Sequence, residues 1–467
     1  MAEMESVKRR MQQDWDWRAR EDALFYVAFG KRAQTREEFL GSAGDVLHTL
    51  REELRRFPPG RDFRRMSALE IGCGPGRLML PLSEIFGTVQ GVDVSGEMIA
   101  LARENLRDVP RAEVRQNSGA DLAGLADESV DFCYSFAVFQ HIPDKDVVWS
   151  YLREACRVLK PGGILKCQCN GLPQPGDAAE REQQVAGWSL RAGVPRNAHR
   201  SLREKNPDTW SGVSFRAEEL ASFMAENNLQ LLAMDRFDTQ YLWVTARKRP
   251  PHWKVPAQHA QASIVRVTGT FTGDAVVAQT GRYASATVWV AGLTEDADLN
   301  NLRVLIDGRS TAPCFIGKQV WNNPTQVNVY LPPGTRAGIL PVELELAGKV
   351  ISNRATVRIL PASPLVPRLA GVTDAVNLLS SHSIESRAVK VKIEEAPFES
   401  EQEFLAAISA DVDGRPIRDM EVLCLDPLPR LYQLDLFLPQ EIPAGLHRLT
   451  LRLGARQFDP LDIEIRE

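Results

Sequence analysis

A glycine-rich turn followed by an acidic residue carries the strongest chemical signal in this chain. The stretch Leu69-Glu70-Ile71-Gly72-Cys73-Gly74-Pro75-Gly76 predicts a short apolar strand that runs into a turn and then a helix over residues 76–86. Gly72 and Gly74 let a ligand approach bare backbone, and the helix would point its N-terminal amides at that ligand. A second strand ends in Asp93, about 20 residues further on, where nucleotide-binding βαβ units place the acid that binds ribose hydroxyls.

Further motifs narrow the kind of nucleotide. Arg77 stands where the dinucleotide fingerprint G-x-G-x-x-G needs its third glycine. Four more stretches follow in order: Gly91-Val92-Asp93-Val94-Ser95-Gly96-Glu97-Met98, Asn117-Ser118-Gly119-Ala120-Asp121-Leu122, Val130-Asp131-Phe132-Cys133-Tyr134-Ser135 and Arg157-Val158-Leu159-Lys160-Pro161-Gly162-Gly163. With the glycine turn, they resemble class I S-adenosylmethionine-dependent methyltransferases over residues 14–247.

This resemblance implies S-adenosylmethionine as the cofactor and assigns roles to residues. The backbone at Gly72, Cys73 and Gly74 would border the amino-acid part of the cofactor, with Glu70 just behind. Asp93 would accept hydrogen bonds from both ribose hydroxyls. The other expected cofactor contacts border the adenine or follow the fourth strand: Val94, Met98, Gly119, Ala120, Asp121, Phe136 and Gln140. An adenine contact from Asp121 or from Ser118 stays open.

Two residues are candidates for catalysis. His141 follows the fourth strand near the expected methyl position, and an imidazole suits a general base. The alternative is that His141 only caps or packs the start of a helix. Asn170, at the end of the fifth strand, is the second candidate. No metal site is predicted, since Cys167 and Cys169 share one face of a strand without a completing Cys or His cluster, so burial explains them.

Alternating strand and helix patterns over residues 58–249 predict the elements that position these residues. The expected strands are 68–71, 88–93, 112–116, 130–135, 163–169, 230–235 and 240–246, and the expected helices after 76–86 are 95–106, 145–158 and 216–227. Residues 1–57 form a helical cap with a capping-box pattern at Thr35 and Glu38. The fold class is an α/β Rossmann-like domain with a seven-stranded sheet whose last strand is antiparallel.

Aromatic and basic residues cluster in the cap, and a polar segment interrupts the α/β pattern. Residues in the cap cluster are Trp15, Trp17, Arg18, Arg20, Phe25 and Tyr26. They would cover the active site as a lid, or only pack the cap onto the domain. The polar segment between Asn170 and Gly212 contains Trp188, Arg191, Arg196, His199 and Trp210. A loop of this length at the carboxyl edge of the sheet predicts a cover on the substrate side.

The rest of the chain is predicted to be all-β. A basic, proline-rich linker spans 250–261, and alternating apolar residues then indicate strands with one buried face. The pattern Val327/Val329/Leu331-Pro332 returns as Leu434/Leu436/Leu438-Pro439, and Ile306-Asp307-Gly308-Arg309 returns as Val412-Asp413-Gly414-Arg415. Residues 262–360 and 366–467 are therefore two copies of one domain type, which resembles the IPT/TIG-type immunoglobulin-like sandwiches of bacterial proteins.

Composition limits the class of protein. The chain has 467 residues, a net charge of −5 and seven cysteines. This predicts about three domains, no nucleic-acid partner, and reduced thiols in a cytoplasmic protein. The charged start of the chain, residues 1–20, is not a secretory signal, and no apolar stretch is long enough to span a membrane.

The resulting hypothesis is a methyltransferase with two β-sandwiches. The acceptor would be a hydroxyl or amine of a small molecule, lipid or glycan. The sandwiches would position a partner or extended substrate, or mediate self-association. Two alternatives stay open: a nicotinamide oxidoreductase, against which Arg77 argues, and a cofactor-binding scaffold with a vestigial methyltransferase domain.

Overall fold

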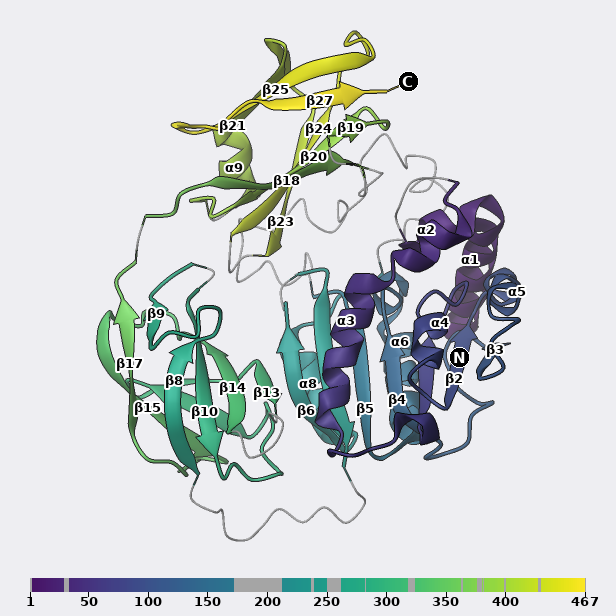
Figure 1. Ribbon diagram of the computed structural model, residues 1–467, viewed down its shortest axis with the longest axis vertical. Helices are drawn as coiled ribbons and strands as arrows, with labels where there is room; N and C mark the ends of the chain where they lie inside the picture. Colours follow the sequence, from purple (N-terminus) through teal and green to yellow (C-terminus); the bar gives the residue numbers. More distant parts are fainter. Residues whose placement is uncertain are drawn as a thin grey trace.

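The computed structural model describes most of the chain. The described residues are 2–28, 33–171, 212–236, 239–249, 262–281, 283–317, 324–362, 364–375, 380, 382–398, 400–426 and 430–466. The predicted substrate-side cover, apart from its first two residues and Gly212, and the predicted linker 250–261 lie outside them. Figure 1 shows a helical N-terminal part, a twisted sheet flanked by helices, and two strand-rich parts, the upper of which includes one helix that the sequence did not predict.

The predicted N-terminal helices are present. They are α1 (Ala2–Ala28), α2 (Arg36–Gly41), α3 (Gly44–Glu53) and the single turns η1 (Leu54–Arg56) and η2 (Phe63–Arg65). The capping box is confirmed, because the Thr35 hydroxyl accepts from the Glu38 backbone N–H and the Glu38 carboxylate accepts from that of Thr35. α1 kinks at Asp22, whose carboxylate accepts a hydrogen bond from the Phe25 N–H at 3.1 Å.

The next part is the predicted seven-stranded sheet. Its strands are β1 (Ser67–Ile71), β2 (Thr88–Asp93), β3 (Ala112–Gln116), β4 (Val130–Ser135), β5 (Leu159–Cys169), β6 (Leu229–Asp235) and β7 (Leu242–Lys248). The order is β3-β2-β1-β4-β5-β7-β6, and β7 is antiparallel to both neighbours, as predicted. The helices between them are α4 (Met79–Ser83), α5 (Gly96–Asn105), η3 (Phe139–His141), α6 (Lys145–Val158) and α8 (Ala217–Glu226).

The helix after the glycine turn is shorter than predicted. α4 includes five residues, Met79–Ser83, instead of residues 76–86. Gly76 has a φ of +84°, and a left-handed residue cannot start a right-handed helix, so the helix does not begin at Gly76 as predicted.

The all-β part contains two units with the same strand order. The first β unit (residues 262–360) comprises β8 (Ser263–Gly269), β9 (Val276–Ala278), β10 (Ser285–Ala291), β11 (Leu302–Ile306), β12 (Arg309–Thr311), β13 (Phe315–Gly317), β14 (Thr325–Tyr330), β15 (Gly338–Leu346), β16 (Lys349–Val350) and β17 (Ala355–Leu360). The second β unit (residues 364–466) comprises β18 (Arg368–Asp374), β19 (Ser383–Ile384), β20 (Ala388–Glu394), α9 (Glu401–Ala407), β21 (Ile408–Val412), β22 (Arg415–Ile417), β23 (Met420–Asp426), β24 (Leu431–Phe437), β25 (Gly445–Leu453), β26 (Arg456–Gln457) and β27 (Leu461–Ile465).

The two β units share one pattern of strand pairing. β13-β14-β10-β8 in the first unit corresponds to β23-β24-β20-β18 in the second. Likewise, β12-β11-β15-β17-β9 corresponds to β22-β21-β25-β27-β19. Each unit therefore has two sheets in the same arrangement, as expected from a duplicated domain.

The first β unit continues the α/β sheet, which the sequence did not predict. β13 pairs antiparallel with β6, so that seven strands of the α/β part and four of the first unit form one eleven-stranded sheet. The Met234 N–H donates to the Cys314 carbonyl at 2.8 Å across this junction. One hydrophobic core includes residues from Val7 of α1 to Ile359 of the first β unit, whereas the second unit has a separate core.

Candidate functional site

A pocket opens at the carboxyl ends of β1, β2 and β4, beneath α1. Its lining comprises Met11, Trp15, Tyr26, Val27, Glu70, Gly72, Cys73, Gly74, Arg77, Leu78, Asp93, Val94, Met98, Phe136, Ala137, Val138, His141, Ile142 and Tyr151. Ligands bind open α/β sheets at this edge, because the strand ends and following loops converge there.

The glycine turn forms the floor of the pocket. Gly72 has a φ of +75°, and its N–H donates to the Val92 carbonyl at 2.8 Å. A Cβ on Gly72 would lie 2.2 Å from a methyl carbon of Val138, so only glycine fits. A Cβ on Gly74 would approach Val27 of α1 to 3.3 Å. The turn is thus packed between the loop after β4 and the helical cap.

Asp93 is held in a fixed orientation by backbone amides. Its Oδ2 accepts from the Gly74 N–H and its Oδ1 from the Ser95 N–H, each at 2.9 Å. Burial raises the pKa of Asp93 to about 6, although these amides act in the opposite direction. At neutral pH the carboxylate is mostly ionised, and each oxygen keeps a lone pair for a ligand hydroxyl.

Glu70 and Arg77 place two titratable groups beside the glycine turn. The Tyr134 hydroxyl donates to the Glu70 carboxylate at 2.9 Å, and burial raises the pKa of Glu70 to about 8. The Arg77 guanidinium is buried and donates through Nη1 to the Ser42 carbonyl at 3.1 Å. Its Nε has no hydrogen-bond partner within the described part of the chain. This end of the pocket therefore offers a buried guanidinium donor and a carboxyl group whose ionised form is disfavoured by burial.

The cap is fastened over the pocket by polar contacts. Asp16 of α1 accepts from the Ser95 hydroxyl at 2.6 Å and from the Glu97 N–H at 3.2 Å, at the start of α5. Arg18 forms a buried ion pair with Asp14 at 2.7 Å and lies 4.7 Å over the Trp15 ring. Trp15 in turn meets the His141 ring edge-on, with the ring centroids 5.7 Å apart. Within the predicted aromatic and basic cluster, Trp15 and Tyr26 line the pocket, whereas Arg18 packs inside the cap.

Nine of the fourteen predicted site residues line the pocket: Glu70, Gly72, Cys73, Gly74, Asp93, Val94, Met98, Phe136 and His141. The other five lie outside the lining: Gly119, Ala120, Asp121, Gln140 and Asn170. The Gln140 side chain contacts His141, with Nε2 of each 3.2 Å apart. The Asn170 carbonyl accepts from the Phe215 N–H at 2.8 Å. Their assigned roles remain predictions.

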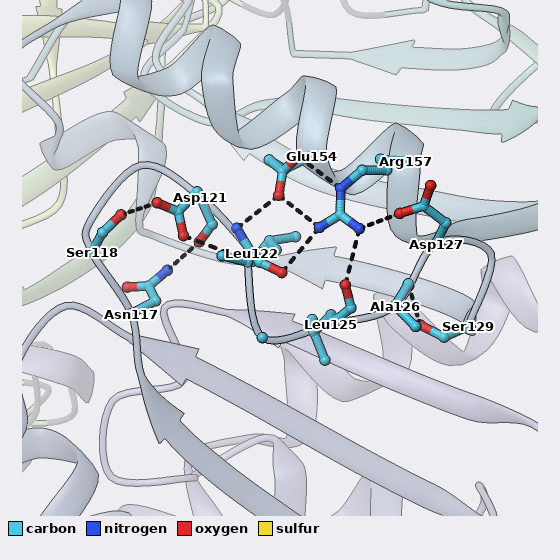
Figure 2. Close-up of polar contacts among 12 residues, drawn as sticks. Asn117, Ser118, Asp121, Leu122, Leu125, Ala126, Asp127, Ser129, Glu154 and Arg157 are labelled. Carbon is cyan, nitrogen blue, oxygen red and sulfur yellow. Dashed lines mark hydrogen bonds and ion pairs between the residues drawn. The ribbon is translucent and has the colours of Figure 1, made fainter. Parts of the chain in front are cut away.

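The loop after β3 contains Ser118 and Asp121, the two residues predicted as alternative adenine contacts. The Ser118 hydroxyl donates to the Asp121 carboxylate, so the two candidates bond each other. Figure 2 shows this loop tied to α6, where Glu154 accepts from the Leu122 N–H at 3.0 Å and Arg157 donates to the Leu122 carbonyl at 3.0 Å. The loop is built around these contacts, with Gly119 packed against Val94.

Several lining residues were missed from the sequence. Arg77 was considered only as a departure from a glycine fingerprint, and Tyr151 fell within the apolar face of a helix. The Tyr151 hydroxyl accepts from the Asn117 side-chain amide at 2.9 Å, which links α6 to the end of β3. A polar group on an otherwise apolar helical face is the signal that marks Tyr151. The other missed residues are apolar and carry no such signal: Met11, Val27, Leu78, Ala137, Val138 and Ile142.

Comparison with known proteins agrees with this geometry. Residues 69–167 match a family described as "Methyltransferase domain". The matched stretch contains the glycine turn and Asp93. An uncharacterized methyltransferase of Mycobacteroides abscessus is 30% identical over 148 residues, which cover 31% of this chain and 55% of that protein. Demethylmenaquinone methyltransferase of Shouchella clausii is 35% identical over 105 residues, covering 22% and 43%.

These similarities are confined to part of each protein. The chain spans about half the length of these two relatives or less. Among solved structures, geranyl diphosphate C-methyltransferase of Streptomyces coelicolor covers 52% of this chain and 97% of its own, with 14% identity and a TM-score of 0.36. Within the described residues, no helix is long and apolar enough to cross a membrane.

Proposed function

We propose that the pocket binds S-adenosylmethionine and that the protein transfers its methyl group to an acceptor. The convergence of the glycine turn, Asp93 and the Glu70–Arg77 end in one pocket, covered by α1, carries this proposal. Most of these residues lie inside the stretch that matches the methyltransferase domain family. The acceptor is a hydroxyl or amine of a small molecule, lipid or glycan.

The residues present fit the cofactor. Asp93 is an oriented double acceptor and would hold the two ribose hydroxyls. Val94 and Met98 would border the adenine. Arg77, whose Nε has no partner among the described residues, would bind the methionyl carboxylate, and an oxygen of Glu70 would accept from the amine.

Positioning is the main contribution that the protein makes. The cofactor supplies an electrophilic methyl group, so the chain must align the acceptor with it, and such alignment is worth about 7–11 kcal/mol. Met11, Trp15 and Val27 of α1 close the pocket with apolar surface and keep water from the reacting atoms. His141 lies on the wall beneath Trp15, where an acceptor would enter.

The two β units are proposed to be immunoglobulin-like sandwiches that serve the methyltransferase domain. The first β unit would act as a fixed extension of its sheet. The second β unit would position a partner or an extended substrate, or mediate self-association. This assignment rests on their strand-rich, duplicated architecture.

Transfer of a labelled methyl group tests the proposal. The full-length protein is incubated with methyl-labelled S-adenosylmethionine and a cell lysate, and the products are separated into protein, lipid, glycan and small-molecule pools. Asp93→Ala removes the ribose acceptor, and Asp108→Ala, at an exposed site, is the matched control. We expect label in one non-protein pool with the wild type and Asp108→Ala only. Cofactor binding without label in any pool would instead support the scaffold alternative, and tight NADH binding without S-adenosylmethionine binding would support an oxidoreductase.

A further inference from the structure

Three side chains form a hydrogen-bonded relay beside the pocket. Gln168 on β5 accepts through Oε1 from the Ala137 backbone N–H at 3.0 Å. Its Nε2 donates to the Gln240 carbonyl at 3.1 Å and to Oε1 of Gln140 at 2.9 Å. Nε2 of Gln140 then lies 3.2 Å from Nε2 of His141.

The backbone groups fix the direction of every hydrogen bond in this relay. The Ala137 N–H is only a donor and the Gln240 carbonyl is only an acceptor, so the Gln168 amide has one allowed orientation. Its NH₂ must therefore face Gln140, which turns the Gln140 oxygen toward Gln168 and the Gln140 NH₂ toward His141. A donor directed at Nε2 requires that Nε2 carry no proton.

Burial makes a reversal of the relay costly. Gln168 is fully buried. Flipping its amide would turn its NH₂ toward the Ala137 N–H and its oxygen toward the Gln240 carbonyl, with no water to compensate. His141 is also buried, with Trp15 against its ring. The relay is thus anchored at one end by backbone and ends at the pocket wall.

We propose that Gln140 and Gln168 are positioning residues that hold His141 as a neutral imidazole with its proton on Nδ1. Nε2 of His141 is then occupied as an acceptor, and a proton placed there would face the Gln140 NH₂. His141 therefore does not take a proton from the acceptor at Nε2, but forms a fixed polar wall of the pocket. The last point rests on the proposed function, whereas the protonation state does not.

Nitrogen NMR of the full-length protein with ¹⁵N-labelled histidine tests the proposal without cofactor or substrate. The chain has seven histidines, and His141→Asn identifies the His141 signals by their loss. At pH 7 we expect the pattern of a neutral ring with a protonated Nδ1 and an unprotonated Nε2. A protonated Nε2 in the wild type, whether neutral or imidazolium, would overturn the proposal.

Gln140→Glu provides a second test that is nearly isosteric. One carboxylate oxygen still accepts from Gln168, and the other presents an acceptor to His141, so Nε2 should become protonated. Gln140→Met, which removes the polar partner, is the matched control and should show no such preference. An unchanged wild-type pattern in Gln140→Glu, with folding verified by circular dichroism, would contradict the relay. Failure of S-adenosylmethionine to bind would reject the proposed function but leave these spectra unaffected.

Discussion

The first β unit shares a sheet and a hydrophobic core with the α/β part, whereas the second β unit, with the same strand order, has a core of its own. Figure 1 shows the first unit against β6 and the second apart from the α/β sheet. Two units with the same strand order thus have different relations to the α/β sheet.

The difference lies in two elements. In the first unit, β13 has three residues and pairs with β6, while its counterpart β23 has seven and pairs only with β24 among the described strands. The first unit also has a loop over residues 292–301 that packs on β6, where the second has α9. In that loop, the Leu299 N–H donates to the Leu231 carbonyl at 3.0 Å.

Buried polar groups reinforce this junction. Nε2 of Gln230 donates to the carbonyls of Glu295 and Ala297 at 2.7 and 3.0 Å, and Arg249 pairs with the buried Asp298. Covering β6 in this way satisfies an edge strand that would otherwise offer free backbone groups. A repeated domain can therefore become part of a neighbouring fold through changes in one strand and one loop.

Deleting the second β unit alone, or both β units together, should give the largest difference in stability. Removal of residues 364–467 leaves every contact of β6 in place, so we expect a soluble protein whose main thermal transition is unchanged. Removal of residues 262–467 exposes β6 and opens the shared core, so we expect aggregation or loss of cooperative unfolding. Calorimetry and gel filtration measure both. A soluble, cooperatively folded 1–261 fragment would show that the first unit is as independent as the second.

Glu53→Gln should give the next largest loss of stability, and only in the transition of the α/β part with the first β unit. Glu53 accepts from Lys166 at 2.7 Å and pairs with Arg56, which also donates to the Ile316 carbonyl. Burial alone would raise the pKa of Glu53, but Arg56 and Lys166 lower it to about 2. The variant leaves a buried Lys166 without its counter-charge, at a cost of about 3–5 kcal/mol.

Acid unfolding tests the sign of this effect. Because the pKa of Glu53 is lower in the folded than in the unfolded state, its stabilisation is complete above about pH 4.5 and disappears as the pH falls toward 2. We expect the variant to lose this part of the acid dependence in the main transition. A change confined to the transition of the second unit would contradict the assignment.

Leu299→Ala and Leu449→Ala form a matched pair with a smaller effect. Both leucines are buried, the first in the shared core and the second in the core of the second unit. Each truncation should cost about 2–4 kcal/mol. Tryptophan fluorescence and calorimetry should show that Leu299→Ala lowers the midpoint of the main transition. Leu449→Ala should lower only the midpoint of the transition of the second β unit. Equal effects on a single transition would show that the two units unfold together.

The sequence was sufficient for local and periodic features. Alternating strands and helices predicted a seven-stranded sheet with an antiparallel last strand, and the repeated Val-x-Val and Asp-Gly patterns predicted the duplicated units. It was insufficient for the β6–β13 pairing, because backbone hydrogen bonds between Met234 and Cys314 leave no side-chain pattern. The start of α4 was also missed, since the left-handed conformation of Gly76 excludes it from the helix.

The site shows the same division. Motif residues such as Gly72 and Asp93 converge as expected because strand order fixes where their carboxyl ends lie. Residues from α1, such as Met11 and Val27, reach the pocket only through the packing of the cap, which is a tertiary property. The direction of the Gln168–Gln140–His141 relay likewise depends on backbone groups that side-chain spacing does not reveal.

Binding of S-adenosylmethionine, measured by calorimetry at pH 7 and pH 5, tests the central claim most directly. Asp93 must be ionised to accept two hydroxyl hydrogen bonds, and burial raises its pKa to about 6, so the Kd should be roughly tenfold weaker at pH 5. Asp93→Asn should bind about 10- to 100-fold more weakly at pH 7 and lose this pH dependence, with Asp108→Asn as the unaffected control. Equal affinity of wild type and Asp93→Asn at both pH values would contradict the assignment of this pocket.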